Sequence, residues 1–225
     1  MLPDDQTASP TDLDQLLAAE FAAKPYHLVD YTELQERSGL EAREFSERFP
    51  DKASLWQYVL GLMQNAKKAV LASVAPPSTS LDTFAYLRWM FQIAVLFELR
   101  HPQLARVEER LFRELESLPT ADPEAEAPAL GADSFRDFLT QGILHDDIAT
   151  WVDTEMAARL LASLYHPTAR YLISRMGDQA KSLADGSVDI VYDPYTQDLF
   201  DTLMDILEAG MARDPQIRKD YYSKY

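Results

Sequence analysis

The sequence predicts an all-α protein with a small N-terminal domain and a larger C-terminal one. Apolar residues recur every three or four positions through most of the chain, which is the period of a helix buried along one face. No segment alternates apolar and polar residues long enough to form a sheet. With 225 residues, 47% of them hydrophobic, the chain can bury both a modest core and a larger one.

Composition excludes several classes of protein. The chain has no cysteine, so it forms no disulfide and binds no metal through thiolates, and a reducing cytoplasm is the expected location. The start, MLPDDQTASPTD, is acidic and lacks the apolar core of a signal peptide. No run reaches the ~20 apolar residues that span a membrane. We therefore expect a cytoplasmic protein without a membrane partner.

The first elements expected are a mobile tail over residues 1–9 and a helix that starts at Ser9-Pro10. A helix-turn-helix follows. Asp30 and Glu33 have the spacing of a capping box, which opens a helix ending near Ser38. Gly39 can take the left-handed conformation that a tight interhelical turn needs. The second helix carries apolar residues at helical spacing and stops at a proline: Ala42, Phe45, Phe49 and then Pro50.

The remaining helices are bounded by capping residues or prolines. They are expected at 51–75, 80–100, 102–115, 134–144, 152–176 with a kink at Pro167, and 194–211. Segments 118–133 and 177–192 are expected to be irregular. In 102–115 the inward residues are predicted to be Leu104, Val107, Leu111 and Leu115, and the outward ones Arg106, Glu108, Glu109 and Arg110.

No motif of an enzyme is present. The chain lacks GxSxG, GxGxxG, a P-loop and HExxH, and its seven glycines are scattered. His145-Asp146-Asp147, with His101 and His166 as distant ligands, is the best metal candidate, but an interhelical turn with solvated acids is the favoured interpretation. We expect neither an enzyme nor a bound metal or cofactor.

The segment 16–60 resembles the DNA-binding domain of the tetracycline-repressor (TetR) family. Seven positions carry the resemblance without a gap: Phe21, Tyr26, Leu34, Gly39, Phe45, Phe49 and Lys52. Other positions depart from the family's pattern. Pro25 replaces the usual Gly at the bend, and Glu41 replaces the usual Ser cap. Arg43 stands at a position that is often small, Ala42 at one that is usually basic, and Ser46 at that of a phosphate-binding Tyr.

The resemblance implies a ligand-responsive transcription regulator, expected to be a repressor. Residues 1–52 would form the helix-turn-helix domain, and residues 53–225 the effector-binding and dimerisation domain. The DNA-contacting residues would be Arg43, Glu44, Ser46, Arg48 and Lys52, with the arginines on phosphate or guanine and Glu44 on cytosine. The alternative is a solvated face in which Arg43 pairs with Glu47, and Glu44 with Arg48.

Apolar side chains of the middle helices are expected to line a pocket for an apolar or aromatic effector, or else to form ordinary core. These residues are Tyr86, Trp89, Met90, Phe97, Phe138 and Trp151. Small and apolar residues of 152–164 and 194–211 match the helices through which the family forms homodimers, with packing inside one subunit as the alternative.

Charge argues against unspecific DNA binding. Residues 1–52 contain twelve acids and five bases, so their net charge is −7, and the whole chain carries −16. An acidic surface repels the phosphate backbone. The second functional hypothesis is therefore a protein-interaction module of the same fold, whose helix-turn-helix no longer binds operator DNA.

Overall fold

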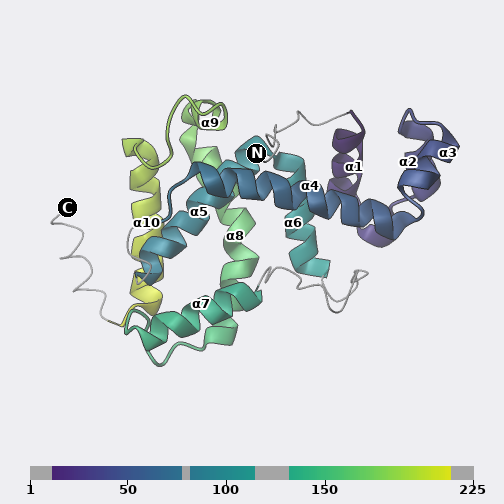
Figure 1. Ribbon diagram of the computed structural model, residues 1–225. Helices are drawn as coiled ribbons and strands as arrows, with labels where there is room; N and C mark the ends of the chain where they lie inside the picture. Colours follow the sequence, from purple (N-terminus) through teal and green to yellow (C-terminus); the bar gives the residue numbers. More distant parts are fainter. Residues whose placement is uncertain (1–11, 78–81, 115–131, 214–225) are drawn as a thin grey trace, which may run out of the picture. The chain divides into compact units, whose positions relative to one another are not determined.

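The computed structural model describes residues 12–77, 82–114 and 132–213. Within these ranges the chain forms ten α-helices and one short 3-10 helix, and the only β-type pairing there is an isolated bridge between Ile148 and Ala212. The predicted all-α class is confirmed (Figure 1). The expected tail at 1–9, the helix start at Ser9-Pro10 and the loop up to residue 131 lie outside the described residues. Among the helices described, none is long and apolar enough to cross a bilayer.

The chain divides into two compact units. The N-terminal unit contains residues 1–66 and 103–123, and the C-terminal unit contains 67–102 and 124–225. Helix α4 begins in the N-terminal unit and ends in the C-terminal one. The chain then forms α5 in the C-terminal unit, and most of α6, which follows, belongs to the N-terminal unit again.

The N-terminal unit contains α1 (Asp12–Ala23), η1 (Tyr26–Leu28), α2 (Tyr31–Arg37), α3 (Ala42–Arg48), the first part of α4 (Lys52–Ser73), and α6 (Pro102–Glu114). Two groups of aromatic rings join its helices. Trp56 of α4 packs on Phe21 and Tyr26, with ring centroids 5.3 and 6.0 Å apart. A second group of rings, with neighbouring centroids 5.2 to 5.4 Å apart, joins α2, α3 and α4 through Tyr31, Phe45, Phe49 and Tyr58.

Local sequence sets several helix ends as predicted. The carboxylate of Asp30 accepts hydrogen bonds from two backbone amides in the first turn of α2. At the start of α4, Asp51 accepts from the amide of Ser54 at 2.7 Å, and its own amide donates to the Ser54 hydroxyl at 3.2 Å. Such caps satisfy N–H groups that have no partner inside a helix. Asp193 caps α10 in the same way.

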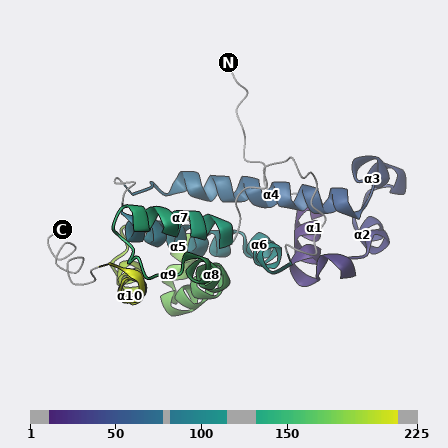
Figure 2. The same cartoon turned by 90° about the horizontal axis from the view of Figure 1, so that it is seen from below.

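The C-terminal unit contains α5 (Thr83–Arg100), α7 (Ala132–Leu144), α8 (Thr154–Met176), α9 (Gln179–Ala184) and α10 (Pro194–Met211). Helix α5 contacts each of the other four (Figure 2). All residues from Phe91 to Glu98 are buried, as the nearly continuous apolar sequence of this helix predicted.

Two predicted boundaries and one predicted loop need correction. Helix α5 begins at Thr83 with Asp82 as its cap, not at Ser80, and α7 begins at Ala132 rather than Ser134. A short helix, α9, forms inside the segment 177–192 that was expected to be irregular. Helix α9 has only six residues, fewer than two turns, which is too few for a periodic pattern to be recognised.

The outward prediction for Glu108 was wrong. This side chain is fully buried, with 0% of its surface exposed. Glu108 follows Leu104 by four residues, so both lie on the same face of α6. Helical register therefore decided its position, although its charge had suggested solvent.

Candidate DNA-binding surface

Helices α2 and α3 are joined by a tight turn at Ser38-Gly39. Gly39 has a φ of +73°, the left-handed conformation expected from the sequence. The Ser38 hydroxyl donates to the Gln35 carbonyl at 2.7 Å and accepts from the Leu40 amide at 3.2 Å. These bonds replace helical ones at the end of α2 and fix the direction in which the chain enters α3.

Two side chains of α2 hold α3 in place. The Gln35 amide donates to the Ala42 carbonyl at 3.0 Å and to the Ser46 hydroxyl at 3.1 Å. The Tyr31 hydroxyl donates to the Phe49 carbonyl at 2.6 Å, at the end of α3. Helix α3 is thus attached to α2 near both of its ends, and Phe45 is buried beneath it.

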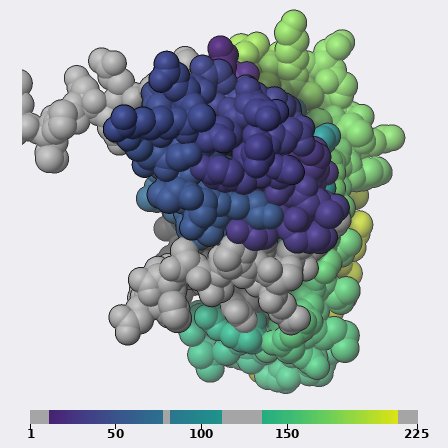
Figure 3. All heavy atoms as spheres, turned by 90° about the vertical axis from the view of Figure 1, so that its right-hand side faces the viewer, coloured from purple at the N-terminus to yellow at the C-terminus, as the bar shows by residue number. Residues whose placement is uncertain are grey.

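The surface of α3 opposite Phe45 is polar and exposed. Arg43 donates from Nε to Glu47 over 2.7 Å, with 88% and 65% of the two side chains exposed. Glu44 and Ser46 are exposed on either side of this pair. Glu41 makes no side-chain cap on α3, so the substitution of the family's Ser leaves this helix start without that bond. The atoms of α1, α2 and α3, purple and blue in Figure 3, form one continuous surface.

Arg48, predicted as a DNA contact, binds within the unit. It donates to the Tyr58 hydroxyl at 2.8 Å and lies 5.1 and 5.0 Å from the ring centroids of Phe49 and Tyr58. The Tyr58 hydroxyl in turn donates to Asp14 at 2.7 Å. Burial first, and then the bond to Asp14, raises the pKa of Tyr58. The chain of contacts ties the end of α3 to α4 and α1.

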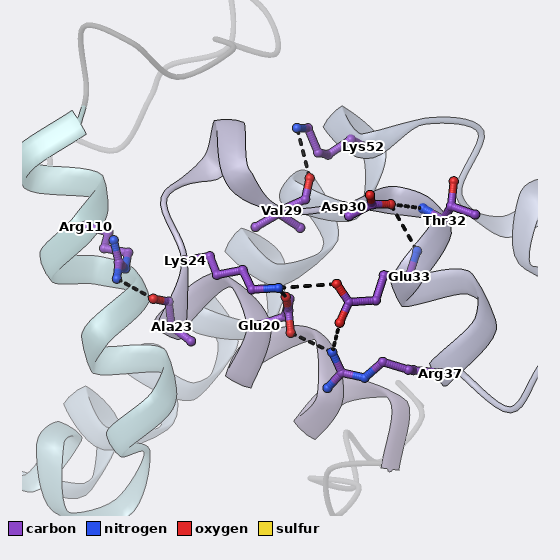
Figure 4. A network of polar contacts seen from close by, with 10 residues as sticks. All are labelled: Glu20, Ala23, Lys24, Val29, Asp30, Thr32, Glu33, Arg37, Lys52 and Arg110. Carbon is purple, nitrogen blue, oxygen red and sulfur yellow. Dashed lines mark hydrogen bonds and ion pairs between the residues drawn. The ribbon is translucent and has the colours of Figure 1, made fainter.

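Lys52, which was predicted to contact phosphate from the start of α4, also has partners nearby. Its ammonium donates to the Val29 carbonyl at 3.1 Å (Figure 4). It also donates to the His27 carbonyl at 3.4 Å and lies 4.8 Å from the Tyr26 ring centroid. An ammonium has three N–H donors, so these bonds leave one for a phosphate. Lys52 therefore holds the bend after α1 against the start of α4.

A network of four charged residues joins α1 to α2 (Figure 4). Glu20 is 6% exposed and pairs with Lys24 and Arg37, and both bases also contact Glu33. Burial works to raise the pKa of Glu20, but the hydrogen bonds from Lys24 and Arg37 outweigh it and lower that pKa. The bond to Glu20 raises the pKa of Lys24. The network fixes α2 relative to α1.

Helix α6 is attached to α1 through Arg110. Its guanidinium donates to the carbonyls of Ala22 and Ala23 at 3.0 and 2.9 Å (Figure 4 draws the second bond). These carbonyls belong to the last turn of α1 and have no partner within the helix. A positive charge there also stabilises the negative end of the helix dipole.

The residues predicted to bind an effector are only partly brought together. Tyr86 lies 5.2 Å from Trp89 and 4.9 Å from Phe138 between ring centroids, and all three are half-buried. Phe97 is buried about 16 Å further along α5 than Tyr86. The Met90 carbonyl accepts from the Tyr165 hydroxyl. Trp151 stands apart from this group, with 74% of its surface exposed in the connection between α7 and α8.

Two of the residues considered as a metal site, Asp146 and Asp147, make structural contacts. The Asp147 carboxylate accepts from the Thr83 amide at 2.9 Å at the start of α5. Asp146 forms an ion pair with Arg213 beyond α10. These bonds agree with the interpretation of 145–147 as a polar turn.

Sequence reasoning missed two residues that shape the surface. Gln35 holds α3, and Tyr58 holds Arg48. The pair of Arg43 and Glu47 was one of the alternatives considered, since these residues are four apart on one helix. Gln35 and Tyr58 act on residues seven and ten positions away, in a different helix.

No family model and no curated protein matches the sequence. Among solved structures, a TetR family transcriptional regulator from Chloroflexus aurantiacus J-10-FL is similar over 90% of this chain and 92% of its own, with 28% identity and a TM-score of 0.68. A gamma-butyrolactone receptor described as ArpA-like is similar over 89% of this chain and 88% of its own, with 14% identity and a TM-score of 0.53. The second likeness concerns the fold alone.

The likeness to the Chloroflexus regulator extends over nearly all of both chains. It agrees with the residues that carried the resemblance in the sequence. It supports a DNA-binding regulator and does not favour the protein-interaction alternative. This similarity in sequence and fold supports a TetR-family transcriptional regulator.

Proposed function

We propose that the protein is a ligand-responsive repressor that binds operator DNA as a homodimer. The observation that carries this proposal is the exposed polar face of α3. This helix is anchored by Gln35 and Tyr31 on its inner side and is free of core contacts on its outer side. In helix-turn-helix proteins the second helix enters the major groove.

Within the groove, Arg43 donates to guanine or phosphate, and Glu44 accepts from the amino group of cytosine. Ser46 contributes a hydroxyl to a phosphate. Arg48 and Lys52 keep their contacts inside the unit and add positive charge at the edge of the surface. The acidic surroundings keep binding to unrelated DNA weak.

The dimer forms through α8 and α10. Met156, Leu160 and Leu164, one helical turn apart on α8, have 60%, 55% and 51% of their surface exposed. Ile206 on α10 is 66% exposed. An apolar stripe of this kind costs free energy in water and is a common centre of an interface between two copies. Such a contact is isologous, so the same helices meet across a two-fold axis.

The effector is an apolar or aromatic compound held by the C-terminal unit near Tyr86, Trp89 and Phe138. These rings are half-buried, and the Trp89 indole already donates to the Val74 carbonyl at 3.2 Å, so its polar atom has a partner. Apolar walls with their polar atoms satisfied suit an apolar ligand. Binding there favours a conformation in which α4 and α6 hold the two α3 helices at the wrong separation for the operator.

Selection from a library of random duplexes tests the proposal. The dimer is expected to enrich a sequence with two-fold symmetry and half-sites about one helical turn apart. The variant Arg43→Ala, which changes a side chain that is 88% exposed, should enrich none. A wild-type protein that enriches no sequence at low salt would show that the chain does not act on DNA. Release of the selected duplex by a library of apolar compounds tests ligand response separately.

A further inference from the structure

We propose that Glu47 is a positioning residue that makes Arg43 read guanine rather than phosphate. This inference rests on the proposed binding of operator DNA. It concerns an acidic residue that, taken alone, should only repel DNA. The ion pair of Glu47 with Arg43 supports it by its position on α3, by the atoms that form its bond and by its small contribution to stability.

The pair occupies the centre of the exposed face of α3. With about 100° between successive residues, Arg43 and Glu47 lie about 160° from Phe45 on either side. Phe45 is fully buried, with 0% of its surface exposed, so the pair points directly away from the core. A helix inserted in the major groove would meet the base edges with these two side chains first.

The atoms used by the pair leave the guanine-binding edge of Arg43 open. The bond to Glu47 is made by Nε at 2.7 Å, whereas the terminal nitrogens carry four more N–H donors. Guanine offers O6 and N7 to two such parallel donors. A carboxylate on Nε fixes the plane of the guanidinium, so less side-chain entropy is lost when guanine binds.

The same carboxylate weakens competition from phosphate. Phosphate attracts any positive charge without regard to sequence. The pair of Arg43 and Glu47 is neutral overall, so its attraction to the backbone is small, while its directed donors to guanine remain. Glu47 therefore lowers the affinity for unrelated DNA and favours recognition of a base.

Folding gives little reason for this pair. Exposed pairs four residues apart contribute little to stability, and the order with the acid first is the better one in a helix. Here Arg43 comes first, and both side chains are more than half exposed. Replacing Glu47 should therefore leave the fold unchanged, which makes the residue suitable for a binding test.

The test compares Glu47→Gln with Glu36→Gln, an equal change of charge at an exposed residue of α2. Dissociation constants are measured for the duplex that the wild type selects and for a scrambled duplex of equal length. Glu47→Gln should weaken binding to the selected duplex about tenfold or more, the scale of one bidentate base contact, and strengthen binding to the scrambled one. Glu36→Gln should strengthen both.

Replacing the contacted guanine with 7-deazaguanine should weaken wild-type binding and have little effect on Glu47→Gln. If Glu47→Gln strengthens both duplexes as Glu36→Gln does, Glu47 is merely a repulsive charge and the inference is wrong. A wild type that selects no duplex would instead overturn the proposed function, and this inference with it.

Discussion

The guanidinium of Arg48 donates to the hydroxyl of Tyr58 at 2.8 Å, across the boundary between α3 and α4. The same guanidinium lies over the rings of Phe49 and Tyr58. Arg48 thus connects the end of α3 to α4, and its predicted contact with phosphate or guanine stays a prediction. Arg43, which points away from the core, has no such task.

Alanine substitution should distinguish the roles of Arg43 and Arg48. Arg43→Ala is expected to remove operator binding and leave the free energy of unfolding unchanged. Arg48→Ala should lower both, because it loses a hydrogen bond and a cation–π contact worth about 1 kcal/mol together at an exposed site. Tyr58→Phe keeps the ring but loses the hydroxyl's bonds to Arg48 and Asp14, so it should also lower the free energy of unfolding, unlike Arg43→Ala. Chemical denaturation and a DNA-binding titration measure the two effects.

Equal loss of stability in Arg43→Ala and Arg48→Ala would contradict this division of roles. The double variant should bind no operator at all.

The charged network around Glu20 predicts a specific pH dependence. Because the folded-state pKa of Glu20 is lowered, its ion pairs stabilise the fold above its ordinary value of 4.5. This contribution is lost as pH falls through the lowered pKa. Glu20→Gln should therefore destabilise the protein by roughly 1 to 3 kcal/mol at pH 7. The difference from the wild type should shrink towards zero as the pH falls from 4.5 through the lowered pKa of Glu20.

Urea denaturation of both proteins between pH 3 and 7 measures this difference. A gap that stays constant over the whole range would mean that the carboxylate charge of Glu20 is not what stabilises α1 against α2.

The exposed stripe on α8 predicts a change of assembly. Leu160→Glu puts a charge at the centre of the proposed interface, where it would have to be desolvated without a partner. The variant should be a monomer by light scattering at micromolar concentration, while the wild type is a dimer. Arg159→Glu, next to it but outside the stripe, serves as the control. A monomeric wild type would contradict both the dimer and the two-fold operator.

Ligand control predicts a fluorescence signal from Trp89. An apolar aromatic compound bound beside Tyr86 and Phe138 should change the emission of this indole, and Trp89→Phe should lose the change. Phe138→Ala should weaken the compound's binding by removing one wall. A screen in which a compound releases DNA without altering Trp89 emission would move the effector site elsewhere.

Helix positions and caps could be predicted from the sequence because they depend on near neighbours. Asp30, Gly39 and Asp193 act on amides or dihedral angles within three residues, and all three behave as expected. The spacing of Phe45 and Phe49 likewise identified the buried face of α3.

The roles of charged side chains could not be predicted in this way, since they depend on contacts between distant segments. Tyr58 and Asp14 are 44 residues apart, and Lys52 and Val29 are 23 apart. A cation in the sequence is equally suited to a phosphate, a carbonyl or an aromatic ring. The apolar spacing around Leu160 left a dimer interface and packing inside one subunit as alternatives, because both give the same pattern.

Salt dependence of operator binding tests the central claim most directly, namely that this acidic surface binds DNA through directed base contacts. Each phosphate neutralised by a base contributes about −0.9 to the slope of log affinity against log salt concentration. At most three bases per subunit lie at contact positions, so the dimer should bind its selected duplex with a slope shallower than about −6 and bind random DNA feebly. A steeper slope with equal affinity for both duplexes would contradict the account. So would a wild type that binds no genomic fragment at low salt while a partner protein co-purifies through the face of α3.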